Sequence, residues 1–222
     1  MHAFALPAFP QGVFLRAATS VLARLRPWLE LRVDVQQRPD DIETELESLY
    51  ERLCTLDDPL YRSRILGALP SGFVFRHREA DGEHYIYVED RVRRRLAGYT
   101  VFNRLIEVNR RVDRYVRAPH SKYAPEYQRQ GLATAVYEFG LDAGFCLISG
   151  ARQSPGAHAL WHALARRHVL GFVSLREKKL HYLGAEVADR DRDELETRMI
   201  LLGKGWTLER LRRIAGAELA RR

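Results

Sequence analysis

The chain has 222 residues, with 36 basic and 29 acidic side chains and a formal net charge of +7 at neutral pH. A domain of this length buries about 70% of the surface of its unfolded chain. Its content of 46% hydrophobic and 29% charged residues is typical of globular rather than disordered proteins. No uninterrupted apolar stretch approaches the ~20 residues of a membrane-spanning helix, so we exclude a spanning protein.

The two cysteines, Cys54 and Cys146, lie far apart in the sequence. This spacing fits neither a disulfide framework nor a paired metal or redox motif. Unpaired thiols are usual in a reducing compartment. We therefore expect a cytoplasmic protein.

The N-terminal segment, residues 3–25, is mostly apolar but lacks the basic start of a secretory signal. Pro7, Pro10 and Arg16 also interrupt it, so we expect no cleaved signal. A short helix over residues 12–25 is predicted instead, packed on a partner or on the protein's own core. We divide the chain into an N-terminal helical extension, residues 1–28, and one domain, residues 29–222.

The first half of the domain is predicted to begin with a strand at residues 29–35. An acidic helix follows: it opens at Pro39, its first turns carry acids that suit the helix dipole, and Asp57-Asp58-Pro59 ends it. A second helix is expected at residues 60–69.

A run of strands comes next. Residues 73–78 and 84–89 flank Asp81-Gly82, and this pattern is a strong hairpin signal. A further strand is predicted at residues 96–105. The stretch from residue 112 to 124 is predicted to be extended, with Pro119 marking a bulge or an edge.

From Gly131 the apolar spacing becomes helical and continues to Gly144. The remaining predicted elements, in chain order, are a strand at 145–149, a helix at 155–168, strands at 170–175, 181–183 and 199–202, and a helix at 207–219 capped by Thr207.

Charge is unevenly distributed along the chain. Residues 40–58 hold eight acidic side chains against one basic one, and residues 91–118 hold nine arginines against two acids. A basic region of this kind can attract nucleic acid, anionic lipid or a phosphorylated small molecule. It can equally be a solvated face that pairs with the acidic helix.

The segment from Pro125 to Thr134 carries the clearest chemistry. It joins a predicted strand to a predicted helix, and Gly131 and Ala133 are small residues at the point where the helix begins. The first turn of a helix leaves N–H groups unpaired, and a pyrophosphate can bind them where no bulky side chain intervenes. Arg129 adds a cation and Thr134 a hydroxyl. An ordinary strand–helix turn is the alternative.

Residues 128–133, Gln-Arg-Gln-Gly-Leu-Ala, match the Q/R-x-x-G-x-G/A signature of the GNAT N-acetyltransferase superfamily. The approach to it, Tyr-Ala-Pro-Glu-Tyr at 123–127, is similar to that family's. Residues 144–149, 153–157 and Leu160-Trp161 resemble the family's next strand and helix. The resemblance is good over residues 112–175, extends by element order from about residue 29, and does not reach residues 1–28.

This resemblance implies a mixed central sheet flanked by helices, with acetyl-CoA or another acyl-CoA as the donor. It implies that a strand pairs with the pantetheine, that a splay between two strands admits the thioester, and that an amine attacks it directly. The residues that the resemblance assigns to the cofactor are Tyr123, Ala124, Gln128, Arg129, Gln130, Gly131, Leu132, Ala133, Thr134 and Ser154.

Two features depart from the family pattern. The family's tyrosine acid would fall at Trp161, whose indole is no useful proton donor to a thiolate, so Trp161 is interpreted as a core residue. Ser149, Ser154 or His158 could supply the proton, or the thiolate could leave unaided.

The base is the second departure. Glu107, Asp113 and His120 all precede the signature, and we predict Asp113 and His120 as the catalytic residues. His158 and His162 are four residues apart, as metal ligands can be, but the sequence places no third ligand beside them. We expect no metal.

The sequence therefore predicts an acyl-CoA-dependent N-acyltransferase that moves an acetyl group from acetyl-CoA to a primary amine of a small molecule or a protein. The alternative is a non-catalytic GNAT-fold module that holds CoA or an acyl ligand and acts through its basic surface. Nucleic acid binding is not expected, because no named motif accompanies the arginines. A homodimer remains open.

Overall fold

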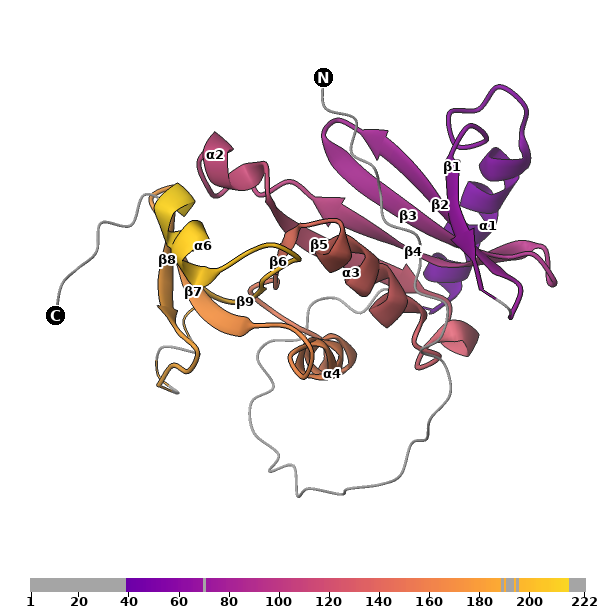
Figure 1. Cartoon of the computed structure of the whole chain (residues 1–222). Coiled ribbons are helices and arrows are strands. Elements are labelled where there is room, and N and C mark those ends of the chain that lie inside the picture. Colours follow the sequence, from indigo (N-terminus) through magenta and orange to yellow (C-terminus); the bar gives the residue numbers. More distant parts are fainter. Residues whose placement is uncertain (1–38, 70, 189, 191–193, 195, 216–222) are drawn as a thin grey trace, which may run out of the picture.

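The computed structural model describes residues 39–215 except 70, 189, 191–193 and 195. The predicted N-terminal extension, the helix at 12–25 and the strand at 29–35 lie outside the described residues. The described part is a mixed α/β structure in which helices flank one large, mostly antiparallel sheet (Figure 1). This confirms the predicted fold class.

The acidic helix α1 (Pro39–Cys54) forms as predicted, with Leu46 and Leu53 buried against the sheet. The predicted helix at 60–69 is wrong, because this segment contains strand β1 (Arg64–Ala68). Its apolar spacing fits a helix, but its backbone pairs with the next strand at the edge of the sheet. Tertiary pairing here overrides the local pattern.

Three strands continue the sheet: β2 (Phe73–Ala80), β3 (Glu83–Asp90) and β4 (Arg95–Asn103). The predicted hairpin is confirmed, with φ of 55° at Asp81 and 77° at Gly82, the left-handed pair that a two-residue turn requires.

The stretch predicted to be extended from residue 112 begins instead with the one-turn helix α2 (Arg110–Asp113). Asn109 caps it, because its side chain accepts hydrogen bonds from the N–H groups of Arg111 and Val112. The strand β5 (Val116–Tyr123) then pairs with β4 and includes Pro119.

The second half confirms the predicted order of helices and strands, and Thr207 caps the last helix as expected. Its elements are the 3-10 turn η1 (Pro125–Tyr127), α3 (Leu132–Asp142), β6 (Cys146–Ile148), α4 (Pro155–Leu164), β7 (Leu170–Arg176), β8 (Lys179–Gly184), β9 (Thr197–Leu201) and α6 (Leu208–Ala215).

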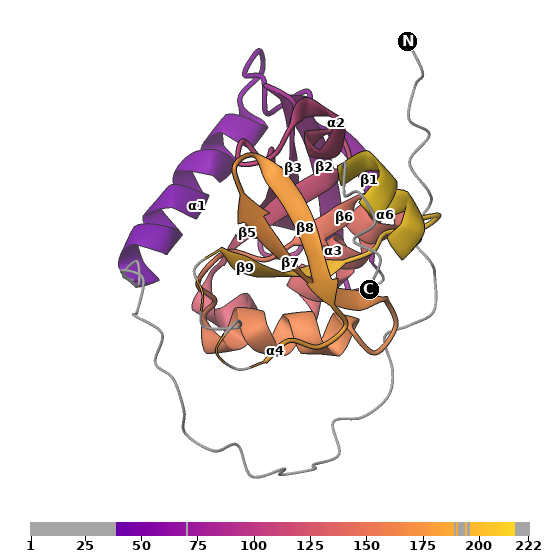
Figure 2. The ribbon, with the colours of Figure 1, turned by 90° about the vertical axis from the view of Figure 1, so that its left-hand side faces the viewer.

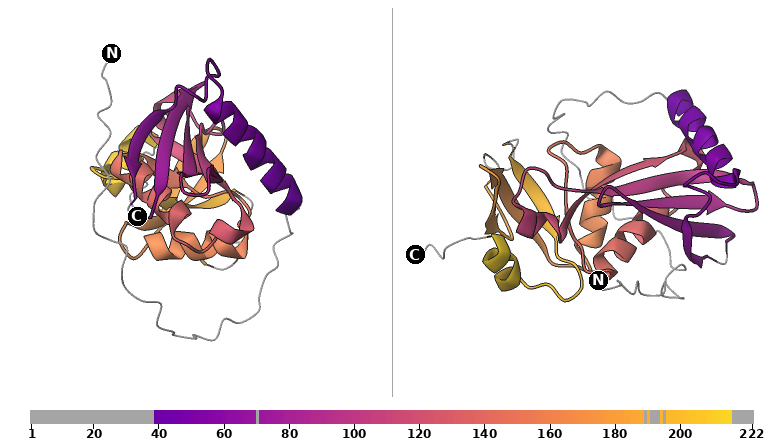
Figure 3. Two further views of the ribbon diagram at one scale, coloured as in Figure 1. Left: turned by 90° about the vertical axis from the view of Figure 1, so that its right-hand side faces the viewer. Right: turned by 90° about the horizontal axis from the view of Figure 1, so that it is seen from above.

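The described strands lie in the order β1-β2-β3-β4-β5-β6-β9-β7-β8. Helices α1 and α3 cover opposite faces: Tyr99 bonds to Glu45 of α1, whereas Phe102, three residues on and therefore on the other face, packs beside Gly140 of α3. Figure 3 shows the sheet from above with helices on both sides.

The buried residues form two clusters. One joins α1, α3 and α4 to strands β2–β5 and also takes in Leu147 of β6, Phe172 of β7, and Met199 and Leu201 of β9. The other joins α2 and α6 to the ends of β5 and β6 and to β7–β9. Figure 2 shows α4 running below β7, β8 and β9. None of the described helices combines the length and apolar character needed to cross a bilayer.

Candidate functional site

Strands β5 and β6 touch over a very short length. They pair in parallel at Val116 with Cys146 and at Arg117 with Leu147. Beyond this point β6 ends at Ile148, whereas β5 continues to Tyr123, paired on its other side with β4. Among the described strands, none pairs with the β6-facing edge of residues 118–123. On this edge Pro119 has no N–H and the Tyr123 carbonyl accepts a hydrogen bond from Gln128, so the groups open to a ligand that pairs like a strand centre on Ser121.

The turn after β5 is tied to the neighbouring strands. The Tyr127 hydroxyl donates to Oδ2 of Asp90 over 2.8 Å, and Nη1 of Arg95 lies 3.0 Å from Oε1 of Glu126. The Gln128 amide donates to the Tyr123 carbonyl over 3.0 Å. This turn is therefore fixed before the signature begins.

The signature then turns sharply into α3. Arg129 and Gly131 have φ of 59° and 79°, and Gly131 stands at the N-cap position with no side-chain cap. The hydrogen bonds found among the described residues include no acceptor for the N–H groups of Leu132, Ala133 and Thr134. Uncapped N–H groups at the start of an 11-residue helix form an electropositive site for an anion.

A chain of hydroxyl groups lies between β4, β5 and α3. Ser121 donates to the Tyr137 hydroxyl over 3.4 Å, so Ser121 must accept from Thr100, 2.8 Å away. Thr100 in turn accepts from Tyr123 over 3.3 Å, since each hydroxyl carries one hydrogen. The Tyr137 hydroxyl ends this chain: its oxygen accepts from Ser121, and its own hydrogen is not used within the chain. Burial raises the pKa of Tyr137 to about 12, so the group stays protonated.

His120 lies on the other face of β5, toward α1, and is exposed. Beside it, Nζ of Lys122 lies 2.7 Å from Oε2 of Glu45, and the Tyr99 hydroxyl donates to Oε1 of Glu45 over 2.6 Å. Desolvation and the Lys122 ammonium lower the pKa of His120, whereas the Glu45 carboxylate opposes this shift. A neutral imidazole on this face is able to accept a proton.

Asp113 has different neighbours. Its Oδ2 receives hydrogen bonds from Arg104 at 2.8 and 3.0 Å, and its Oδ1 receives the Leu105 N–H at 2.8 Å. Nη1 of the buried Arg117 lies 3.7 Å from Oδ1. These donors hold the carboxylate at the start of β5, so this geometry favours a structural role, and catalysis by Asp113 stays an untested prediction.

Trp161 is 2% exposed and packs edge-on to Tyr137 at 6.4 Å, which confirms the interpretation of Trp161 as a core residue. Ser154 caps α4 by accepting the Ala157 N–H at 3.2 Å. Cys146 lies where β5 and β6 meet, and burial raises the pKa of its thiol to about 12, so it is not a nucleophile at neutral pH.

The structure thus brings most of the predicted cofactor residues to one end of β5 and the start of α3. Ser154 lies apart, at the start of α4, and His120 lies on the opposite face of β5 from Ser121. Sequence reasoning missed Tyr137 and Glu45. The pattern that could have found Tyr137 is a hydroxyl in the middle of an apolar helix.

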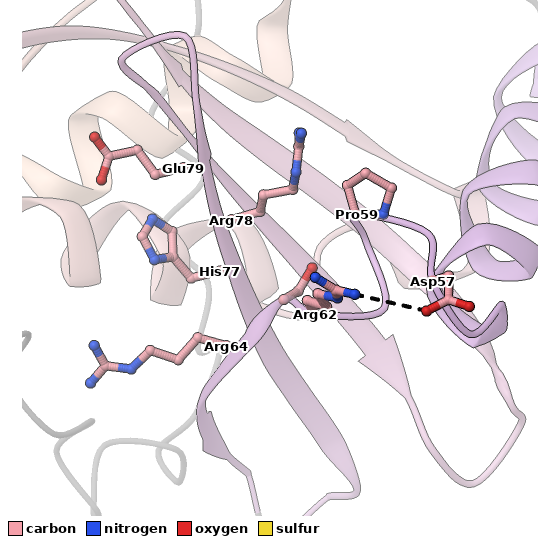
Figure 4. Close-up of a pocket in the computed structure, with 8 residues that line it drawn as sticks. Asp57, Pro59, Arg62, Arg64, His77, Arg78 and Glu79 are labelled. Carbon is pink, nitrogen blue, oxygen red and sulfur yellow. Dashed lines mark ion pairs between the residues drawn. The ribbon is translucent and has the colours of Figure 1, made fainter.

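A separate pocket of about 490 Å³ lies at the β1–β2 edge of the sheet, away from β6 (Figure 4). Charged side chains dominate its lining, and Nη2 of Arg62 lies 3.8 Å from Oδ1 of Asp57. In the described residues, no group of three or more His, Cys, Asp or Glu side chains is arranged to hold a metal ion.

Two solved structures similar to this chain are acetyltransferases. One is a GNAT superfamily phosphinothricin acetyltransferase from Sinorhizobium meliloti in complex with AcCoA, at 19% identity and a TM-score of 0.34, covering 56% of this chain. This chain spans 63% of that protein's length, less than two thirds.

The other is a chimera of the spermidine N-acetyltransferase SpeG from Vibrio cholerae and hSSAT. It shows 17% identity and a TM-score of 0.33, covering 75% of this chain and 92% of its own. No protein-family model matches the sequence, and no match to a curated protein was found.

Proposed function

We propose that this protein is an acyl-CoA-dependent N-acyltransferase that transfers an acetyl group from acetyl-CoA to a primary amine of a small molecule or a protein. The observation that carries the proposal is the separation of β5 from β6 after two residue pairs, directly upstream of an uncapped helix start. It supplies a backbone edge for an extended amide-bearing arm and an anion site at the end of that edge.

The two parts of the site match the two parts of CoA. The pantetheine carries amides that can pair with the β6-facing edge of residues 118–123, as an added strand would. The pyrophosphate would accept hydrogen bonds from the N–H groups at the start of α3, with the exposed Arg129 guanidinium adding positive charge. The thioester would then lie between β5 and β6, close to Arg117 and Leu147.

The acceptor must lose a proton before or during attack, because a primary amine is an ammonium ion at neutral pH. In our proposal His120 accepts this proton, directly or through water. The amine nitrogen then forms a bond to the thioester carbonyl carbon and the carbon–sulfur bond breaks. The second proton that the nitrogen loses passes to the departing thiolate, so the products are the amide and CoA as a thiol. The Tyr137 hydroxyl, at the end of its hydrogen-bonded chain, would donate a hydrogen bond to the developing negative charge.

Titration calorimetry with acetyl-CoA tests the anion site. Gly131→Asp places a carboxylate at the start of α3, where it repels the pyrophosphate, and should weaken binding at least about 100-fold. Gly131→Asn is the matched control, since asparagine has the size of aspartate and the same tolerance of a positive φ without the charge. It should retain most of the affinity.

Equal affinity in wild-type protein and in Gly131→Asp would contradict the proposal. Acetyl-CoA binding without transfer to any of a panel of primary amines would instead favour the non-catalytic binding module.

A further inference from the structure

Two histidine pairs in this protein have the same nitrogen–nitrogen distance. Nε2 of His77 lies 3.1 Å from Nδ1 of His84, on strands β2 and β3. Nε2 of His158 lies 3.1 Å from Nε2 of His162, one turn apart on α4. The distance alone does not distinguish a hydrogen bond from a pair of metal ligands, but the orientation of the rings does.

The first pair has the geometry of a head-on hydrogen bond. In such a bond the ring nitrogens point at each other, which adds a ring radius of roughly 1.1 Å at each end and puts the centroids roughly 5.3 Å apart. The His77 and His84 centroids are 5.3 Å apart, with the ring planes within 13° of parallel. The lone pair of one ring is therefore directed at the N–H of the other.

The second pair is oblique. The His158 and His162 centroids are 4.3 Å apart and the ring planes are inclined by 59°. Their nitrogens cannot point straight at each other at this separation. A small ring rotation lets both lone pairs converge on a third atom beside them. Both side chains are exposed, so an ion from solvent can reach them.

The spacing also matches a chelate. Two imidazole nitrogens, each about 2.1 Å from a metal ion, lie roughly 3.0–3.4 Å apart for bond angles between 90° and tetrahedral. We propose that His158 and His162 form a two-imidazole binding site for a divalent transition metal ion on the exposed face of α4, with water completing the coordination. This site is independent of the acyl-transfer site.

Ligand chemistry sets the expected selectivity. Imidazole suits Cu²⁺, Ni²⁺ and Zn²⁺, with Cu²⁺ strongest, whereas Mg²⁺ and Ca²⁺ take oxygen ligands. Because the two ligands are one turn apart, a bound ion bridges that turn. The ion should therefore raise the unfolding temperature of the protein as its concentration rises.

The test is calorimetric titration of the full-length, untagged chain with NiCl₂, ZnCl₂ and MgCl₂. One equivalent of Ni²⁺ or Zn²⁺ should bind, and Mg²⁺ should not. His158→Ala and His162→Ala should each weaken Ni²⁺ binding at least about tenfold, because one ligand of the chelate is lost. His181→Ala, at an exposed position of β8, is the matched control and should bind as the wild type does.

A second measurement identifies the ligands. The electron paramagnetic resonance spectrum of one equivalent of Cu²⁺ should show two nitrogen ligands in the wild type and one in either α4 variant. Unchanged binding in both α4 variants, or no binding of any of these ions to the wild type, would overturn the proposal. Far-ultraviolet circular dichroism and the unfolding temperature of each metal-free variant check that the overall fold is retained.

Discussion

The two halves of the sheet are built differently. From β1 to β5 each strand pairs with its neighbour in the sequence, and β2 and β3 alone share eight residue pairs. From β6 to β8 the spatial order is β6-β9-β7-β8, and β6 contributes only two pairs on each side. The first half is a continuous surface, whereas the second is a smaller sheet joined to it by β6.

This difference locates the candidate site. Parallel strands need a crossover connection, and α3 supplies it between β5 and β6. Its start therefore lies at the end of β5, beside the edge that β6 leaves unpaired. In the proposed enzyme, the pantetheine of CoA would pair with the part of the β5 edge that β6 leaves unpaired.

The largest expected effect concerns α4, whose buried side chains belong to a cluster that takes in both halves of the sheet. Trp161 lies in this cluster with residues of α3 and β2–β5 and with Phe172, Met199 and Leu201 of the second half. Trp161→Ala should lower the free energy of unfolding by about 3–5 kcal/mol through lost burial and a cavity. Trp161→Phe should cost clearly less. Urea denaturation measures both, and a small loss for Trp161→Ala would mean that the two halves hold together without this helix.

The same difference explains what could be predicted from the sequence. The β2–β3 hairpin was predictable because Asp81-Gly82 is a local signal, and α3 because its apolar spacing is regular. The signature residues were predictable because they are consecutive. The meeting of β9 with β6 was not, since no local pattern specifies a partner fifty residues away. Nor was Glu45 beside Lys122, a contact that requires knowing which face of the sheet α1 covers.

The second prediction tests the point where the halves meet. Asp113 holds the buried Arg117, which lies in the last residue pair between β5 and β6. Asp113→Ala leaves that guanidinium without its carboxylate and should lower the free energy of unfolding by about 3 kcal/mol. Arg104→Ala removes the more exposed partner of the same carboxylate and should cost no more than about 1 kcal/mol.

Urea denaturation of both variants distinguishes a structural from a catalytic Asp113. A stable Asp113→Ala protein with acetyl-CoA affinity intact and transfer abolished would instead restore Asp113 as the base.

The smallest expected effect is a shift in a pH profile on the α1 side of β5. In the folded protein the pKa of His120 is lowered, so His120 should remain neutral, and able to accept a proton, below the pH at which an ordinary imidazole becomes charged. The acidic limb of kcat/KM should accordingly lie below pH ~6.5.

Lys122→Met removes the cation that lowers the pKa of His120, whereas the Glu45 carboxylate, which raises it, stays in place. The pKa of His120 should therefore rise, and the limb should move to higher pH. Glu45→Gln is the matched opposite, because removing the carboxylate lowers that pKa and moves the limb to lower pH. Identical limbs in all three proteins would show that His120 is not the group whose protonation limits transfer.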